Sequence, residues 1–169
     1  VMRQVNYISG LAHQRAMQKV ANKNNTDKYE YQIEAEMLHE FARFGARHAA
    51  YASIVAGGNN GNILHYTANS DVLVDGDLLL IDAGGELNGY AADITRTFPV
   101  NGKFSDAQKN LYQLVLDAQI KVIESIKPGV SFAQLNRLCH KYLTIGLVDL
   151  GILSGDIETL LKEKAVKKY

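Results

Sequence analysis

Two aspartates on either side of a predicted turn could bind a cation together. Asp82 ends the apolar run 78–81, and Asp93 follows it beyond Asn88-Gly89. That dipeptide is typical of a two-residue type I′ turn, which needs positive φ at both central positions. The turn would make the carboxylates diagonal neighbours on one face of a hairpin, about 7–8 Å apart at Cα. Carboxylates aimed at one point repel each other unless a cation or a proton lies between them.

The same turn fixes the expected pairing of the two strands. Asp82 should face Thr95, and Gly84 should face Asp93, so that all four residues lie on one side of the hairpin. A hydroxyl at Thr95 could hydrogen-bond and orient the Asp82 carboxylate. Thr95 could equally be an ordinary β-branched strand residue.

The alternative to a metal site is a solvated hairpin face, on which paired acids are common. Asp82, however, directly follows a run that is typical of a buried strand, and burying an unpartnered carboxylate is costly. Carboxylate oxygens suit hard or borderline divalent ions such as manganese, and paired ions lie about 3.5–4 Å apart. We therefore favour the metal site.

The residues around these aspartates resemble aminopeptidase P, the Xaa-Pro aminopeptidases of the pita-bread metallopeptidases. The resemblance is carried by residues 63–67, 81–84 and 93–105, and it extends over essentially the whole chain. It implies that Asp82 ligates one of two divalent metal ions, usually manganese. It also implies that Asp93 bridges both ions.

The resemblance further places His65 in the active site, near the substrate or the developing oxyanion, and Tyr51 at the substrate pocket. From the residues alone, His65 between Leu64 and Tyr66 could be a core histidine, and Tyr51 could be a packing aromatic. The match of residues 63–67 to the family motif favours the active-site role of His65.

Other parts of the family pattern are missing from this sequence. The family completes its site with a histidine and two glutamates, one of them the expected general base, and none of these three has a counterpart among the 169 residues. A creatinase-like amino-terminal domain also normally precedes the catalytic one. We therefore expect residues 1–169 to be a partial catalytic domain, truncated before its second hairpin. Such a fragment should bind metal weakly or not at all, and it should be inactive.

The implied reaction is metal-dependent hydrolysis that releases the amino-terminal residue from peptides with proline at the second position. One alternative is a prolidase or a methionine aminopeptidase of the same fold, and another is a non-catalytic pita-bread module that binds peptide or protein. Leu64-His65-Tyr66 and Asp82-Ala-Gly favour the proline-specific branch. Retention of both Asp82 and Asp93 argues against an ancestral loss of the metal site, whereas the missing ligands would let the chain as it stands behave as a binding module.

The elements that must position these residues form an α+β pattern, an antiparallel sheet flanked by helices. Apolar spacing predicts helices over 5–20 and 33–44, joined by a polar connection over 22–28, and strands over 51–55, 63–66 and 78–98. Ser105 and Ser131 each begin a capping box that opens a further helix, and Asp156 can cap a short last one. His13, within the first helix, is expected at the surface or its boundary.

Composition narrows the class of protein. Eighteen basic and eighteen acidic residues cancel, so neither a nucleic-acid nor an anionic-membrane partner is expected. No apolar run approaches the ~20 residues of a membrane helix, no signal peptide is recognised, and the single Cys139 excludes an internal disulfide. These features predict a cytoplasmic protein. An unpaired sheet edge in the truncated domain would favour a homo-oligomer.

Overall fold

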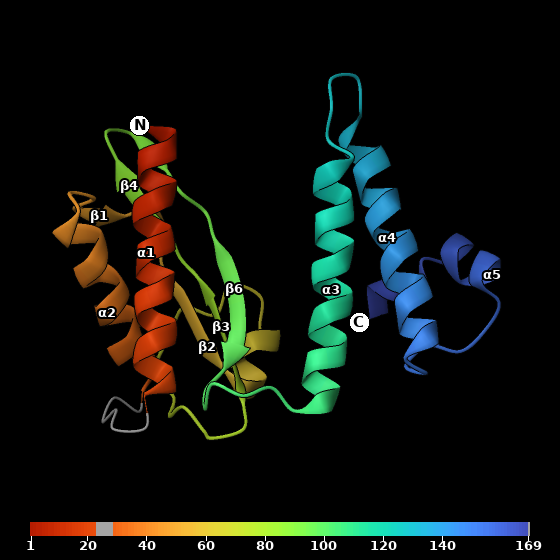
Figure 1. The fold of residues 1–169 in the computed structure, drawn as a ribbon, viewed down its shortest axis with the longest axis horizontal. Coiled ribbons are helices and arrows are strands. Elements are labelled where there is room, and N and C mark those ends of the chain that lie inside the picture. The colour runs from red at the N-terminus through yellow and green to blue at the C-terminus, as the bar shows by residue number, and fades with distance from the viewer. Residues whose placement is uncertain (23–28, 169) are drawn as a thin grey trace. The chain divides into compact units, whose positions relative to one another are not determined.

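The computed structural model describes residues 1–22 and 29–168, so most of the predicted connection over 22–28 lies outside the described residues. The chain forms two compact units, Val1–Phe104 and Ser105–Tyr169 (Figure 1). In the described part of the chain, no helix is long and apolar enough to span a bilayer.

In the described residues of the first unit, the chain forms two helices, a short 3-10 helix and six strands. They are α1 (Met2–Ala21), α2 (Glu30–Arg43), β1 (His48–Ala49), β2 (Ile54–Gly57), η1 (Gly58–Asn62), β3 (Leu78–Asp82), β4 (Gly85–Leu87), β5 (Tyr90–Ala91) and β6 (Thr95–Pro99). The strands form two antiparallel three-stranded sheets, ordered β1-β4-β5 and β2-β3-β6. The single sheet expected from the sequence is thus divided in two.

The hairpin register predicted from the turn is confirmed. Asn88 and Gly89 have φ values of 52° and 82°, as a type I′ turn requires. β4 pairs with β5 directly across this turn, and further along the ribbon Asp82 pairs with Thr95. Strands β3 to β6 therefore form one hairpin ribbon with a single register, and this ribbon contributes two strands to each sheet.

The ribbon is interrupted between β3 and β4 at Gly84. On either side of the interruption, the Ala83 amide donates to the Ile94 carbonyl at 3.1 Å, and the Ala92 amide donates to the Gly85 carbonyl at 3.0 Å. At Gly84 the opposite strand passes so close that a Cβ atom would collide with the Ala92 carbonyl group. Only glycine fits this crossing without moving the backbone.

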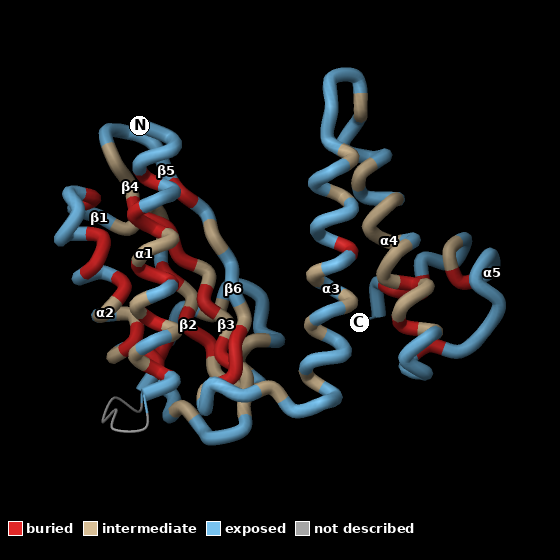
Figure 2. Tube along the Cα trace, in the orientation of Figure 1, coloured by how far each residue is buried: buried red, intermediate tan, exposed pale blue. Residues whose placement is uncertain are grey.

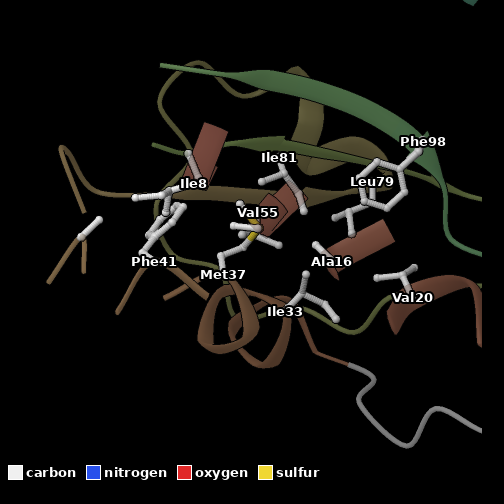
Figure 3. Packing of buried hydrophobic residues seen from close by; sticks show 13 residues of the cluster. Ile8, Ala16, Val20, Ile33, Met37, Phe41, Val55, Leu79, Ile81 and Phe98 are labelled. Atoms are coloured by element: carbon white, nitrogen blue, oxygen red, sulfur yellow. The ribbon is translucent and has the colours of Figure 1, made fainter. Parts of the chain in front are cut away.

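The core of the first unit lies between the two helices and the β2-β3-β6 sheet (Figure 3). Leu79 and Ile81 of β3 are fully buried in it, whereas Leu78, Leu80 and Asp82 are half-buried. Figure 2 shows buried residues gathered on the helices and strands around this core. Since strand side chains alternate between faces, Asp82 lies on the sheet face that points away from the helices. The candidate site is therefore on the face opposite the core.

Ion pairs connect the two helices α1 and α2. Arg15 of α1 contacts Glu36 of α2 at 2.5 Å and Glu40 at 3.3 Å, and Lys19 lies 3.3 Å from Glu36. Burial raises the pKa of Glu36, but the hydrogen bonds and charges of Arg15 and Lys19 outweigh it and leave the pKa below its usual value.

The second unit is helical, with a small core of its own. It comprises α3 (Asp106–Glu124), α4 (Phe132–Asp149), α5 (Ile157–Lys162) and η2 (Ala165–Lys168). The predicted capping boxes at Ser105 and Ser131 are present, and the Asp156 side chain caps α5. Leu147 of α4 packs with Leu160 of α5 in the core.

The strand predictions between the helices and the hairpin are partly wrong. The strand expected over 51–55 is β2, which begins only at Ile54, so Tyr51 precedes it in a bend. Residues 63–65 form a turn after η1 instead of a strand, and His65 has a φ of 56°. That left-handed conformation is incompatible with a strand.

Candidate functional site

The two aspartates of the hairpin converge on one tyrosine hydroxyl. The Tyr51 Oη donates a hydrogen bond to Asp82 Oδ1 at 2.6 Å and lies 3.3 Å from Asp93 Oδ1. Both carboxylates are therefore within hydrogen-bond reach of one oxygen atom, which agrees with the shared face that the register predicts.

The Tyr51 hydroxyl has a single proton to share between two carboxylates. Burial, the hydrogen bond to Asp82 and the negative charges of Asp82 and Asp93 together raise the pKa of Tyr51 above its usual value. The hydroxyl therefore stays protonated and donates at any physiological pH. One proton cannot fully satisfy two acids, so the pair retains lone pairs that a cation could use.

Three of the predicted site residues line one cavity of about 290 Å³: His65, Asp82 and Thr95. Its walls also include Ile54 of β2 and Leu80 of β3, so polar groups lie beside an apolar sheet surface. His65 is exposed, and the alternative of a core histidine is therefore wrong. Thr95 is exposed at the position that pairs with Asp82.

Two polar residues of α1 contact the hairpin backbone from the core side. His13 is only 3% exposed, so the prediction of a surface position is wrong, and its Nε2 lies 3.1 Å from the Ala83 carbonyl oxygen. The Ser9 hydroxyl accepts a hydrogen bond from the Gly85 amide at 3.0 Å. Burial lowers the pKa of His13, which keeps the ring neutral near pH 7. These contacts fix the backbone on both sides of Gly84.

The oxygen donors of this site suit a hard divalent ion, but they are few. Asp82 and Asp93 together offer four carboxylate oxygens, whereas manganese and magnesium prefer about six oxygen ligands. Within residues 1–22 and 29–168, no group of three or more His, Cys, Asp or Glu side chains is arranged to hold an ion. The described residues therefore fit part of a metal site.

Comparisons with known proteins give consistent results. The model of metallopeptidase family M24 matches residues 1–162. The chain is 52% identical over its full length to an Xaa-Pro aminopeptidase of Haemophilus influenzae and 45% identical to that of Escherichia coli. It spans 38% and 37% of the lengths of these two relatives.

Solved structures show the same fold. Proline aminopeptidase P II from Yersinia pestis matches 98% of the chain with a TM-score of 0.92 and 53% identity. Zinc-substituted Escherichia coli aminopeptidase P in complex with product matches it with a TM-score of 0.92 and 46% identity. The chain covers 37% of each of these structures. The described residues thus have the architecture of the corresponding part of the pita-bread fold, and the chain belongs to metallopeptidase family M24.

Proposed function

We propose that this chain takes part in the metal-dependent release of the amino-terminal residue from peptides with proline at the second position. The observation that carries the proposal is the convergence of Asp82 and Asp93 on the Tyr51 hydroxyl, beside a cavity that Asp82 and His65 line. The similarity to Xaa-Pro aminopeptidases supports the choice of substrate.

Asp82 and Asp93 would hold two divalent ions, for which we propose manganese. Such ions lower the pKa of water and polarise a carbonyl group. Tyr51 donates to Asp82 and so restricts the rotation of that carboxylate, and Thr95, opposite Asp82, is proposed to add a second hydroxyl donor. The chain therefore supplies the charge of the site and the groups that orient it.

His65 is proposed to bind the substrate and to stabilise the oxyanion that forms during hydrolysis. Its exposed ring lines the same cavity as Asp82, so it can reach a peptide there without leaving a core position. In comparable sites, removal of one oxyanion donor lowers kcat by about 100-fold to 1,000-fold. Tyr51 is proposed to contact the substrate as well, since its hydroxyl group reaches both aspartates.

The chain by itself is proposed to bind metal weakly and to be inactive, since two carboxylates leave most coordination positions of two ions open. This ligand count favours a second candidate, a module that binds peptides without hydrolysing them. For either role we propose a cytoplasmic homo-oligomer.

The test measures the hydrolysis of two peptides by the longest polypeptide that the gene encodes, in the presence of Mn²⁺. The proposal predicts release of arginine from Arg-Pro-Pro and not from Arg-Ala-Ala. Loss of this activity is expected in Asp93→Asn. A fall in kcat of about 100-fold is expected in His65→Ala, with an unchanged melting temperature because the side chain is exposed.

Other outcomes identify the alternatives. Cleavage confined to an Xaa-Pro dipeptide would indicate a prolidase, and preference for Met-Ala-Ser would indicate a methionine aminopeptidase. Binding of Arg-Pro-Pro without cleavage would indicate the peptide-binding module. Full activity in Asp93→Asn would contradict the proposed site.

A further inference from the structure

A glutamate outside the candidate metal site is completely buried. Glu30, the first residue of α2, has an exposed fraction of 0%. Burying a carboxylate costs several kcal/mol unless hydrogen bonds compensate it. Its partners therefore indicate what the residue does.

Among the described residues, four donors surround the Glu30 carboxylate, two at each oxygen. Oε1 accepts from the Gly57 amide at 2.8 Å and from Asn60 Nδ2 at 3.0 Å. Oε2 accepts from the Tyr66 hydroxyl at 2.7 Å and from the Asp71 amide at 2.9 Å. These four hydrogen bonds compensate the burial of the carboxylate.

These donors delimit the segment that carries His65. Gly57 ends β2 and Asn60 lies in η1, before His65, whereas Tyr66 and Asp71 follow it. One oxygen of Glu30 therefore binds the start of the segment, and the other binds its end. Tyr66 directly follows His65 in the chain. The hydrogen bond from the Tyr66 hydroxyl to Glu30 therefore restricts the backbone beside His65.

The segment has little apolar anchoring of its own near His65. Leu64 is 88% exposed and Ile63 is 55% exposed. His65 itself is exposed and has a left-handed φ of 56°, which costs free energy in a non-glycine residue. A segment with exposed apolar residues and a strained turn depends on its polar contacts for a defined position.

We propose that Glu30 is a positioning residue that fixes the 57–71 segment and thereby holds His65 at the cavity lined by Asp82. The role of His65 in this statement rests on the proposed function, whereas the ordering of the segment does not. Burial and the hydrogen bond to Glu30 also raise the pKa of Tyr66, so its hydroxyl remains a donor near neutral pH.

Replacement by glutamine tests the carboxylate specifically. Glutamine has the same shape, but its amide nitrogen donates and cannot accept. Either orientation of the amide would set this nitrogen against a backbone N–H, that of Gly57 or that of Asp71. Glu30→Gln must therefore lose at least one hydrogen bond.

The first measurement is native-state hydrogen exchange on the 169-residue chain. The probes are the amides of Ile63 and Tyr66, which donate to Asn60 and Ile63 and never touch Glu30. In Glu30→Gln they should exchange about tenfold faster or more, the factor that corresponds to one lost hydrogen bond to a charged group. The Leu79 and Ile81 amides of the core strand serve as the internal reference.

Two further variants make the result decisive. Glu36→Gln removes another carboxylate of α2, one that pairs with Arg15 and Lys19. It should change the exchange rates of the Ile63 and Tyr66 amides no more than those of the core reference amides. Tyr66→Phe should accelerate exchange at position 66 and leave the Gly57 amide protected. If Glu30→Gln does not fold, Tyr66→Phe alone decides. Unchanged exchange at position 66 in that variant overturns the proposal, as does equal acceleration of loop and core amides in Glu30→Gln.

The second measurement uses the longest encoded polypeptide with Arg-Pro-Pro and Mn²⁺. Glu30→Gln should lower kcat more than it changes KM, and the double variant with His65→Ala should be no slower than His65→Ala alone. Additive losses would overturn the positioning role. Absence of cleavage in every protein, with the exchange effect present, would contradict the proposed function and leave the ordering of the segment supported.

Discussion

Replacement of Gly84 by alanine should push apart the two strands that carry the aspartates. A Cβ atom at Gly84 would lie closer than 3.0 Å to the carbonyl oxygen and carbon of Ala92 and 3.1 Å from the Asp93 amide nitrogen. All three atoms belong to the backbone, so the collision cannot be relieved by the movement of a side chain. The strand that contains Asp93 must move instead.

The magnitude follows from the contacts at this crossing. Overpacking costs typically about 1–3 kcal/mol, and a backbone collision belongs at the upper end of that range. The displacement would also stretch the Ala83–Ile94 or the Ala92–Gly85 hydrogen bond, each worth about 1 kcal/mol. We expect Gly84→Ala to lower the free energy of unfolding of the first unit by about 2–4 kcal/mol.

Urea unfolding followed through the amide signals of β3 and β6 measures this quantity for the first unit alone. Gly10→Ala is the matched control, because nothing lies within 4 Å of a Cβ atom there. Alanine within a helix should raise stability by about 0.5–1 kcal/mol. Equal stability of Gly84→Ala and the wild-type chain would refute the reasoning, since it would show that the strands do not approach each other as closely as the structure has them.

Three further predictions concern side chains and edges of the first unit. Tyr51→Phe removes the hydroxyl between the aspartates, so the metal-free chain should lose about 1 kcal/mol of stability in urea; no loss would show that the hydrogen bond to Asp82 contributes nothing. The pKa of Glu36 lies below its usual value in the folded chain, so its ionised carboxylate stabilises the fold near neutral pH, and the contribution disappears as pH falls through the folded-state pKa. The stability difference between the wild-type chain and Glu36→Gln should therefore be present at pH 7 and shrink in acid, and a constant difference from pH 7 to pH 3 would contradict this assignment. Strand β6 lies at the edge of its sheet, and an edge strand can recruit another chain, so light scattering should show self-association that increases with concentration; a monomer at all concentrations would count against this prediction.

Local sequence determined the features that could be predicted. Asn88-Gly89 fixes the hairpin register because few other dipeptides adopt its turn, and this register places Asp82 opposite Thr95. The capping boxes at Ser105 and Ser131 depend on residues three positions apart, and both are present. Such signals need no knowledge of the tertiary structure.

Contacts between distant segments could not be predicted in this way. Tyr51 precedes Asp82 by 31 residues, and Glu30 precedes Tyr66 by 36, so no local pattern links either pair. The strand expected over 63–66 fails for the same reason, because hydrogen bonds between this segment and the distant Glu30 override the strand propensity of its apolar and aromatic residues. His13 is different, since it lies four residues after the buried Ser9 on the apolar stripe of α1, and that spacing was a usable signal.

The central claim, that Asp82 and Asp93 hold a divalent ion between them, is tested most directly by paramagnetic broadening with Mn²⁺. In the nuclear magnetic resonance spectrum of the chain, the account predicts that the amide signals of Ala83 and Ile94 broaden first. The chain should bind Mn²⁺ weakly, so the broadening should need a high Mn²⁺ concentration. It should disappear in both Asp82→Asn and Asp93→Asn. Broadening that is strongest elsewhere, or that persists unchanged in both variants, would contradict the account.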